Sequence, residues 1–286
     1  MISNISNFLY DILSTPLYLS KALLQYSKPT ISGIQRSRNS LIIVCNGPSL
    51  NASLETILQV RDDHDLLVVN NIAQSEVYTA LKPEYYLLAD PAFFNNENQI
   101  ALKTLDKIFS ETSWDMNFLL PANCEEKLDD YYNSHIARYY YNKTSIGGIR
   151  FVRQLLYKWG FGLPSCTNVL MPSLLSGVNM GYKVIYIFGA DFSWLKNLNV
   201  DFEKNTILSD EHFYDKKVVY RNLSSENKEH NTNMSISQQV FNFYRMLKNL
   251  DRIHQYAGYM GANIYNCSEQ TMIESFPRLR FTTLST

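Results

Sequence analysis

The sequence predicts an α/β protein built on an open, mostly parallel sheet with helices on both faces. Two observations lead to this prediction. Short apolar runs rich in β-branched residues alternate with stretches of helical length, as strands and helices do in parallel sheets. Each run also stops abruptly at Asn, Asp, Gly or Pro, the residues that form tight turns. The length of 286 residues suits one large domain of this kind.

Six apolar runs are the predicted strands. The first reads LIIVC and ends at the turn NGPSL, where Ser49 or Asn51 caps the next helix. The clearest reads KVIYIF and ends at GAD. In chain order the predicted strands cover residues 41–45, 65–69, 84–89, 117–120, 183–188 and 263–267. Helices are predicted at 54–60, 73–81, 102–109, 149–158, 167–180 and 236–256.

The turn residues that follow the strands share one edge of the predicted sheet. Ligands of open parallel sheets bind beyond this edge, at the carboxyl ends of the strands. The same residue types also form ordinary turns, but their repetition at four strand ends favours a binding site. Gly47 is expected to let the backbone approach a ligand, and the amides after Ser49 to attract a phosphate. The candidate residues are Asn46, Gly47, Pro48, Ser49, Asn70, Asn71, Asp90, Gly189, Ala190 and Asp191.

Residues 1–38 are predicted to be a helical leader and linker, and residues 39–286 the main domain. The first 25 residues are apolar but interrupted by Asn, Asp, Pro and Lys, so neither a spanning helix nor a secretory signal is expected. Their leucines fit one or two short helices. Such helices either pack on the domain or lie on a membrane surface, and the sequence leaves both open.

The segment 192–235 interrupts the alternation of strands and helices. It is polar and aromatic, and a structureless insertion of this length is typically a functional lid or a disordered segment. Its aromatic residues favour a lid that orders over a ligand. His212 and His230 are candidate bases and Tyr214 is a candidate phenolic donor, although an ordinary surface role stays open for each histidine.

Charge and motif content argue against several classes of protein. The 26 basic and 27 acidic residues give a net charge of -1, so a nucleic-acid partner is not expected. Four scattered cysteines without a CxxC pair indicate a reducing compartment. The chain has neither a GxxxxGK[ST] phosphate loop nor a GxSxG elbow. The histidines lack metal-ligand spacing, and Asp63-His64-Asp65 precedes a strand, so no metal site is predicted.

In combination, four motifs resemble the bacterial sialyltransferases of glycosyltransferase family forty-two. They are LIIVCNGPSL at 41–50, Asn70 after the second strand, Asp90-Pro91 after the third, and GYKVIYIFGADFSW at 181–194. The pattern is also similar to the wider 6-hydroxymethylpterin diphosphokinase MptE-like family, which includes the central domain of flagellin-glycosylating nonulosonate transferases. The resemblance covers residues 41–276 and implies a Rossmann-like sheet, a GT-A-like variant with an inserted lid.

This resemblance implies a transferase that uses a CMP-linked sugar. The lid tyrosine and catalytic histidine of the family would correspond to Tyr214 and to His212 or His230. The family has an asparagine at the position of Asp90. The resemblance places Asn46, Gly47 and Ser49 at the phosphate and ribose, and Asn70 and Asp90 near the sugar and phosphate. Gly189 and Asp191 would hold the cytidine, with Asn168 close by. The remaining implied substrate-binding residues are Pro48, Thr167 and Ala190.

The implied reaction moves a CMP-activated nonulosonate or a related acidic sugar onto a surface-glycan acceptor with inversion, as in polysaccharide or lipopolysaccharide synthesis. The phosphate is already a good leaving group, so neutral donors and one base suffice without a metal or other cofactor. We expect a cytoplasmic protein whose partners are a nucleotide-sugar donor and a glycan acceptor. Contact with the inner face of the membrane through residues 1–25 and homo-oligomer formation stay open.

Three alternatives compete with this hypothesis. One is a diphosphokinase that uses ATP and magnesium, as the MptE-like label suggests, against which the shortage of clustered acidic residues counts. The second is a transferase for another nucleotide sugar. The third is a non-catalytic nucleotide- or glycan-binding domain, in which His212→Ala and His230→Ala would have no activity to reduce.

Overall fold

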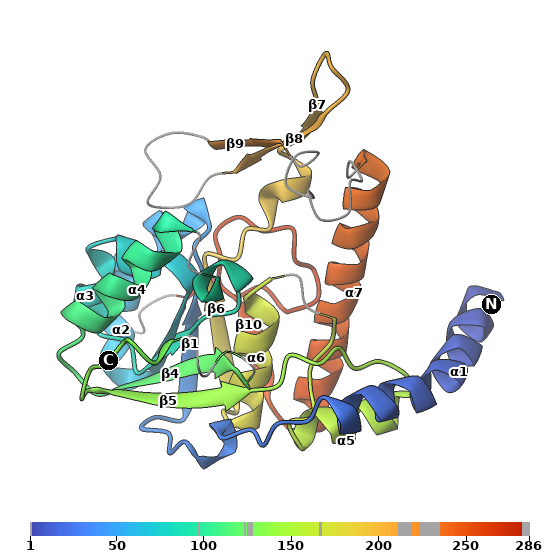
Figure 1. Ribbon diagram of the computed structural model, residues 1–286, viewed down its shortest axis with the longest axis horizontal. Coiled ribbons are helices and arrows are strands. Elements are labelled where there is room, and N and C mark those ends of the chain that lie inside the picture. Colours follow the sequence, from blue (N-terminus) through green and yellow to red (C-terminus); the bar gives the residue numbers. More distant parts are fainter. Residues whose placement is uncertain are drawn as a thin grey trace.

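The computed structural model describes residues 2–95, 98–122, 124, 128–165, 168–210, 219–222 and 235–281, with the backbone alone at 2–7, 209–210 and 219–222. Seven strands form one parallel sheet in the order β10-β6-β1-β2-β3-β4-β5 (Figure 1). The fold class predicted from the sequence is therefore confirmed. The strands are β1 (Ser40–Val44), β2 (Asp65–Val69), β3 (Tyr85–Leu87), β4 (Met116–Pro121), β5 (Ile136–Tyr141), β6 (Val184–Phe188) and β10 (Asn263–Asn266).

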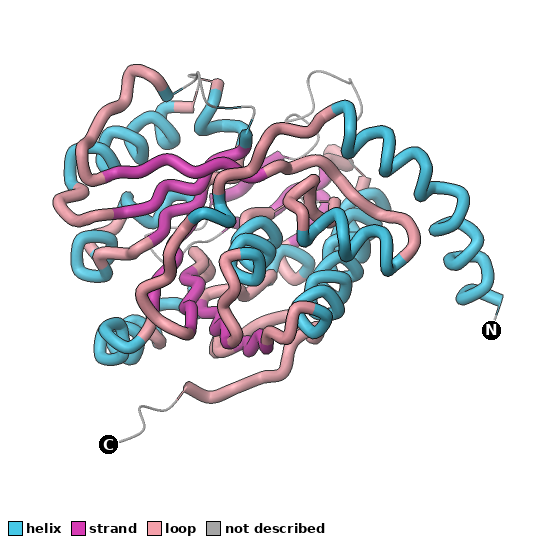
Figure 2. The backbone as a smooth tube through the Cα atoms, turned by 90° about the horizontal axis from the view of Figure 1, so that it is seen from below, coloured by secondary structure: helices cyan, strands magenta, loops and turns pink. Residues whose placement is uncertain are grey.

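Helices cover both faces of this sheet (Figure 2). Consecutive residues of a strand point to opposite faces, so each strand contributes to two cores. Ile42 and Val44 of β1 belong to one core, and Leu41 and Ile43 belong to the other. The first core contains α2 (Leu54–Val60), α3 (Val77–Leu81) and α4 (Gln99–Glu111), and the second contains α5 (Arg150–Lys158), α6 (Leu170–Asn179) and α7 (Ile236–Tyr259).

The order in which strands are added to the sheet reverses at β1, although all the strands are parallel. Strands β2 to β5 follow one another outward on one side of β1, whereas β6 and β10 lie on its other side. The chain after β1 leads to α2 on one face, and the chain after β6 leads towards α7 on the other. Two neighbouring strands whose loops turn to opposite faces leave a crevice at their carboxyl ends.

One strand of this sheet, β5, is absent from the sequence-based prediction. It lies at the edge of the sheet, pairs with β4 alone, and reads IARYYY. Most of its residues are only half-buried. An edge strand that is partly exposed needs no continuous apolar run, so the pattern that reveals buried strands does not reveal this one.

The prediction of a structureless insertion at 192–235 is wrong for the part of that segment that is described. Three short strands, β7 (Leu198–Val200), β8 (Thr206–Asp210) and β9 (Val219–Asn222), form an antiparallel sheet. In Figure 1 this small sheet stands beyond the carboxyl edge of the main sheet. The backbone groups of the segment thus find hydrogen-bond partners within it.

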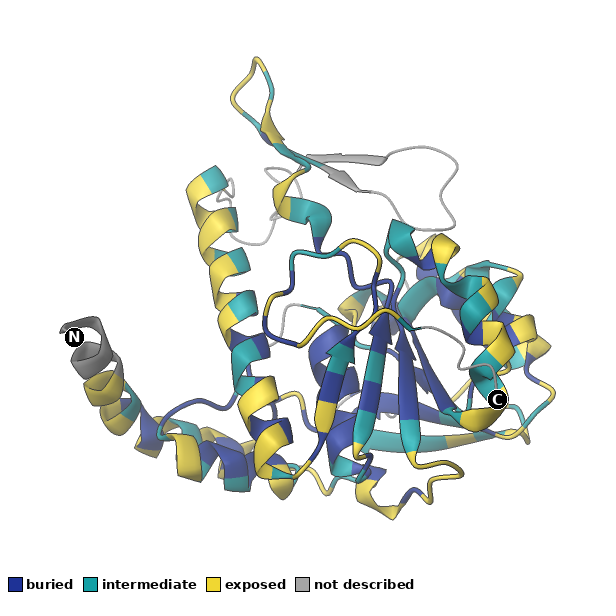
Figure 3. Cartoon of the chain, turned by 180° about the vertical axis from the view of Figure 1, so that it is seen from behind, coloured by how far each residue is buried: buried dark blue, intermediate teal, exposed yellow. Residues whose placement is uncertain are grey.

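The N-terminal segment forms one continuous helix, α1 (Ile2–Leu24), rather than two short ones. Its first half leads away from the body of the molecule (Figures 1 and 3). Between α1 and β1 the chain is packed, and Ile31 and Ile34 are buried in the same core as α6. None of the described helices is long and apolar enough to cross a membrane.

Asp65, from the Asp63-His64-Asp65 motif, has a structural role at the amino end of β2. Its side chain is buried, and its Oδ2 accepts the backbone N–H groups of Ser37 and Arg38, each over 3.0 Å. The Tyr182 hydroxyl also donates to this oxygen. Asp65 therefore fixes the segment that precedes β1. It does so at the amino ends of the strands, whereas the candidate binding residues lie at the carboxyl ends.

We predict that Asp65→Ala lowers the free energy of unfolding by about 3 kcal/mol, because three donors lose their buried acceptor. Urea unfolding followed by circular dichroism measures this change. Asp63→Ala is the matched control, because Asp63 is exposed, and we expect a change within about 0.5 kcal/mol. Equal losses in the two variants would contradict the assignment.

Candidate functional site

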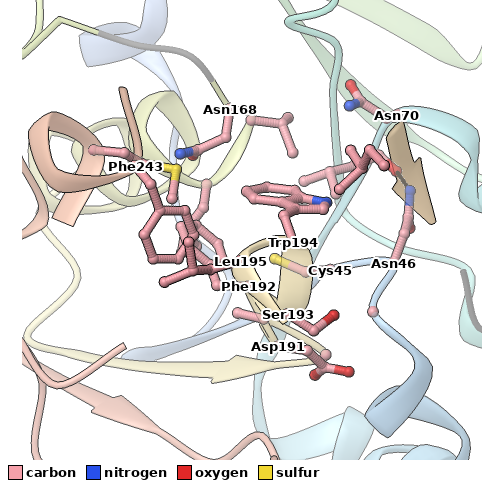
Figure 4. A pocket seen from close by; sticks show the side chains of 18 of the residues that line it. Cys45, Asn46, Asn70, Asn168, Asp191, Phe192, Ser193, Trp194, Leu195 and Phe243 are labelled. Carbon is pink, nitrogen blue, oxygen red and sulfur yellow. Dashed lines mark hydrogen bonds between the residues drawn. The ribbon is translucent and has the colours of Figure 1, made fainter. Parts of the chain in front are cut away.

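A pocket of about 460 Å³ lies at the carboxyl edge of the sheet, over the crevice between β1 and β6 (Figure 4). This volume is within the usual range of small-molecule sites. The turns after four strands, the start of α6, the inserted segment and α7 all contribute to the lining. The lining residues are 45–48, 69–71, 90, 168–170, 189–195, 198, 208, 239, 242, 243 and 246.

Most of the candidate residues identified in the sequence line this pocket, and their roles in binding stay predictions. Four of the others, Thr167, His212, Tyr214 and His230, lie outside the described residues. Ser49 is described but is not part of the lining. The candidate residues that do line the pocket are Asn46, Gly47, Pro48, Asn70, Asn71, Asp90, Asn168, Gly189, Ala190 and Asp191.

The turns after β1 and β6 are joined by hydrogen bonds. The Gly47 amide donates to the carbonyl oxygen of Gly189 over 2.8 Å, and the Ser49 amide donates to Asp191 Oδ2 over 2.8 Å. The Ser49 hydroxyl donates to the other carboxylate oxygen. A Cβ atom on Gly47 would lie 2.5 Å from the Gly189 oxygen. Glycine is therefore required for the close approach of the two turns, rather than for the approach of a ligand that the sequence predicts.

Ser49 has a different environment from the one expected for a phosphate contact. Its amide and its hydroxyl both donate to a carboxylate. The helical segment that begins here is a single short 3₁₀ helix, Pro48–Ala52. The carboxylate of Asp191 thus occupies the donors that were expected to attract a phosphate, and Ser49 positions the turn.

Burial shifts the titration of two groups in the pocket. It raises the pKa of the Asp191 carboxyl, while the two hydrogen bonds from Ser49 oppose that shift. Burial, with a smaller contribution from the nearby charge of Asp191, raises the pKa of the Cys45 thiol to about 12. At neutral pH this thiol is protonated, so Cys45 does not supply a thiolate nucleophile.

Asn46 lines the pocket and carries a buried hydrogen-bond acceptor. Its Nδ2 donates to the carbonyl oxygen of Val69 over 3.3 Å. This contact fixes the orientation of the amide, because Oδ1 in the same place would face another acceptor. Oδ1 is then buried and has no hydrogen-bond partner among the described residues. A hydroxyl or amino group of a ligand would satisfy it, whereas an unprotonated oxygen would not.

The turns after β2 and β3 are held by their own polar side chains. Asn70 adopts the left-handed conformation (φ 45°), which asparagine tolerates better than most residues. Its Oδ1 accepts the N–H group of Ala89 over 3.4 Å, so its NH₂ group is left to donate. Asp90 Oδ1 accepts the N–H group of Ala92 over 2.9 Å and caps a short 3₁₀ helix. Asp90 thus has a structural role as well as a place in the lining.

Trp194 lies in the middle of the pocket, with Phe243 to one side and Asn46 to the other (Figure 4). It follows Phe192, whose left-handed backbone (φ 54°) is unusual for a bulky residue. The two ring centroids are 5.0 Å apart. The aromatic content of the inserted segment was the signal for Trp194 in the sequence.

The contribution of α7 was missed in the sequence analysis. Four of its side chains line the pocket, and their spacing of three or four residues puts them on one face of the helix. The helix was predicted, but this face mixes amides with apolar residues and does not differ from an ordinary amphipathic pattern. The residues are Gln239, Asn242, Phe243 and Met246.

The described lining contains two acidic residues, Asp90 and Asp191, and no Lys, Arg or His. No three His, Cys, Asp or Glu side chains in the described part of the chain are arranged to hold a metal ion. The pocket therefore offers acceptor oxygens, amide donors and aromatic rings. This combination suits a ligand with hydroxyl or amino groups and a flat ring.

No protein-family model matches the sequence, and no curated protein matches it either. Among solved structures, the chain is similar to the MAf glycosyltransferase from Magnetospirillum magneticum AMB-1, with a TM-score of 0.51 and 16% sequence identity. The chain shares its fold with a glycosyltransferase. The match covers 98% of this chain and 42% of that protein, so the chain spans less than half of its solved neighbour. The resemblance to sialyltransferases and to the MptE-like family stays a prediction.

We predict that Gly47→Ala lowers the free energy of unfolding by about 2 kcal/mol, because its Cβ forces the two joined turns apart. Urea unfolding measures the loss. Gly258→Ala is the matched control: nothing lies within 4 Å of the added Cβ, and alanine within α7 should stabilise by up to about 1 kcal/mol. A Gly47→Ala protein as stable as the parent would refute the close contact of the turns.

Proposed function

We propose that this protein is a glycosyltransferase that moves a sugar from a nucleotide donor to a glycan acceptor. The observation that carries the proposal is the place of the pocket, at the carboxyl edge where the strand order reverses between β1 and β6. Open α/β sheets bind nucleotides at this point. The fold shared with a glycosyltransferase supports the same class. We further propose a CMP-linked nonulosonate or related acidic sugar as the donor, transferred with inversion and without a metal ion.

The lining is chemically suited to a nucleoside. The indole of Trp194 offers a flat surface on which a base can stack. The buried Oδ1 of Asn46 requires a donor, which a ribose hydroxyl or the amino group of cytosine supplies. A phosphate oxygen supplies no proton. Of the phosphate and ribose that the resemblance implies near Asn46, we therefore keep the ribose and add the base as an alternative. The NH₂ group of Asn70 is a neutral donor for the phosphate.

The proposed reaction is a single displacement. The acceptor hydroxyl oxygen bonds to the anomeric carbon, the bond from that carbon to the phosphate oxygen breaks, and CMP leaves with the bonding electrons. The hydroxyl proton passes to a base on the protein. Attack from the side opposite the leaving group inverts the anomeric carbon.

We propose His212 or His230 as the base, following the resemblance. Among the described lining residues, Asp90 is a second candidate, because its carboxylate is exposed at the pocket. Asp191 is less suited, because Ser49 donates to both of its carboxylate oxygens.

Nucleotide binding tests the donor class. At a concentration about 100 times its Kd, CMP should raise the Tm of the full chain by roughly 5 °C, with or without magnesium. UMP should raise the Tm less, because it lacks the amino group of cytosine. CDP, UDP, GDP and ATP complete the panel, and differential scanning fluorimetry records each shift.

Variants connect this response to the pocket. Asn46→Ala should abolish most of the CMP-dependent shift, whereas Asn199→Ala, the same change at an exposed residue of β7, should preserve it. Stabilisation by ATP with magnesium, and none by CMP, would contradict the proposal and favour the diphosphokinase. A stronger response to UDP or GDP would favour a different nucleotide-sugar donor.

Turnover of a CMP-activated nonulosonate, measured as CMP release, identifies the base. We expect either His212→Ala or His230→Ala to lower kcat by about 10²- to 10⁴-fold. Asp90→Asn keeps the capping oxygen and removes the charge, so it should change kcat by less than about tenfold unless Asp90 is the base. CMP binding without any turnover of donor and acceptor by the parent protein would favour a binding domain.

A further inference from the structure

We propose that α1 and the segment packed beside it bind the surface of an anionic lipid bilayer. We call residues 8–28 and 143–159 the membrane face. This inference is independent of the proposed glycosyltransferase activity, because neither segment contributes to the pocket at the carboxyl edge.

The membrane face concentrates exposed apolar side chains. Of the 23 large hydrophobic residues that are exposed in the described part of the chain, 12 lie in these two segments. Leu13 is 79% exposed, Leu17 55% and Leu24 86%. Figure 3 shows exposed residues along the part of α1 that it colours by burial. A concentration of exposed apolar side chains in one region favours an interaction site over ordinary surface.

From Asp11 onward, α1 is attached to the body of the molecule. The backbone N–H group of Ile149 donates to Thr15 Oγ1 over 2.9 Å, and Arg153 Nη1 lies 3.5 Å from Asp11 Oδ2. A Cβ atom on Gly148 would lie 2.5 Å from Thr15 Oγ1, so the helix and the turn before α5 are in close contact. The apolar side chains of α1 are therefore presented on a fixed surface.

The charge of the membrane face is opposite to that of the rest of the protein. Its six basic residues against one acidic residue give a net charge of +5, whereas the whole chain carries -1. The one acidic residue, Asp11, is paired with the buried Arg153. The other five cations are all exposed: Lys21, Lys28, Lys143, Arg150 and Lys158. Such cations next to apolar side chains are the composition of interfacial helices that bind anionic lipids.

Aromatic side chains lie beside these cations. Trp159, 56% exposed, directly follows Lys158, and its ring centroid is 6.5 Å from that of Phe161. The Tyr26 ring is 4.6 Å from the same phenylalanine. Trp and Tyr gather at the boundary between lipid and water, where a ring can be half-buried and its polar atom hydrated. The apolar helix, the cations and the aromatic rings thus all fit the surface of an anionic lipid bilayer.

The same charges argue against a second copy of the chain as that occupant. In a symmetric dimer the same surface of each subunit faces the other. Five exposed cations would then face five more, and no exposed acidic residue of the membrane face would compensate for them. An anionic bilayer supplies the opposite charge.

Vesicle sedimentation tests this inference. The full chain should bind vesicles of phosphatidylcholine with about 30% phosphatidylglycerol. Its binding to vesicles of phosphatidylcholine alone should be weaker by a factor of at least about ten. Sodium chloride at about 0.5 M should weaken binding to the anionic vesicles by screening the exposed cations.

Two matched double variants separate the membrane face from general surface effects. L13E/L17E should weaken binding to anionic vesicles by about tenfold or more. L58E/I100E adds the same two charges at exposed apolar residues of α2 and α4 and should bind as the parent does. Circular dichroism checks that both variants are folded, and the Tm shift with CMP shows whether the pocket is intact.

Three results would overturn the inference. One is a failure of the parent protein to bind anionic vesicles. Another is equal binding by L13E/L17E and by the parent. The third is a dimer in analytical ultracentrifugation that L13E/L17E dissociates and that anionic vesicles do not displace, because the face would then join two copies of the chain.

Discussion

The pocket depends on one contact, between the turn after β1 and the turn after β6. These strands are neighbours at the place where the strand order of the sheet reverses, so their loops turn to opposite faces. The hydrogen bonds from Gly47 to Gly189 and from Ser49 to Asp191 hold the turns together at the base of the crevice. Because Gly47 has no side chain, the turns lie close enough for these bonds. The loops that line the pocket are built around this contact.

Carboxylates at the two ends of the sheet show why residue type alone does not identify a site. Asp65, at the amino edge, is surrounded by backbone donors and a tyrosine hydroxyl, and it holds the chain that enters β1. Asp191, at the carboxyl edge, is also satisfied by protein donors, yet it borders the pocket. Among the buried side chains of the described residues, protein donors leave one acceptor unsatisfied, Oδ1 of Asn46, which belongs to an uncharged amide. The described lining thus combines amides with two carboxylates and has no cation, so it is not a dedicated anion site.

We propose different roles for two surfaces of the molecule. The carboxyl edge of the sheet carries the pocket, and α1 with the chain around α5 carries exposed apolar and basic side chains. A transferase whose acceptor is part of a surface glycan gains from being held at a membrane, because its acceptor is then locally concentrated. The pocket and the membrane face consist of different residues, so a change in one should leave the other intact.

The sequence by itself determined the parallel sheet, because buried strands read as continuous apolar runs and the residues after them read as turns. It thereby placed Asn46, Asn70 and Asp191 at one edge. Only the tertiary structure showed that Ser49 bonds to Asp191, that one face of α7 lines the pocket, and that β5 completes the sheet. These features arise from contacts between segments far apart in the chain, and local periodicity does not record such contacts.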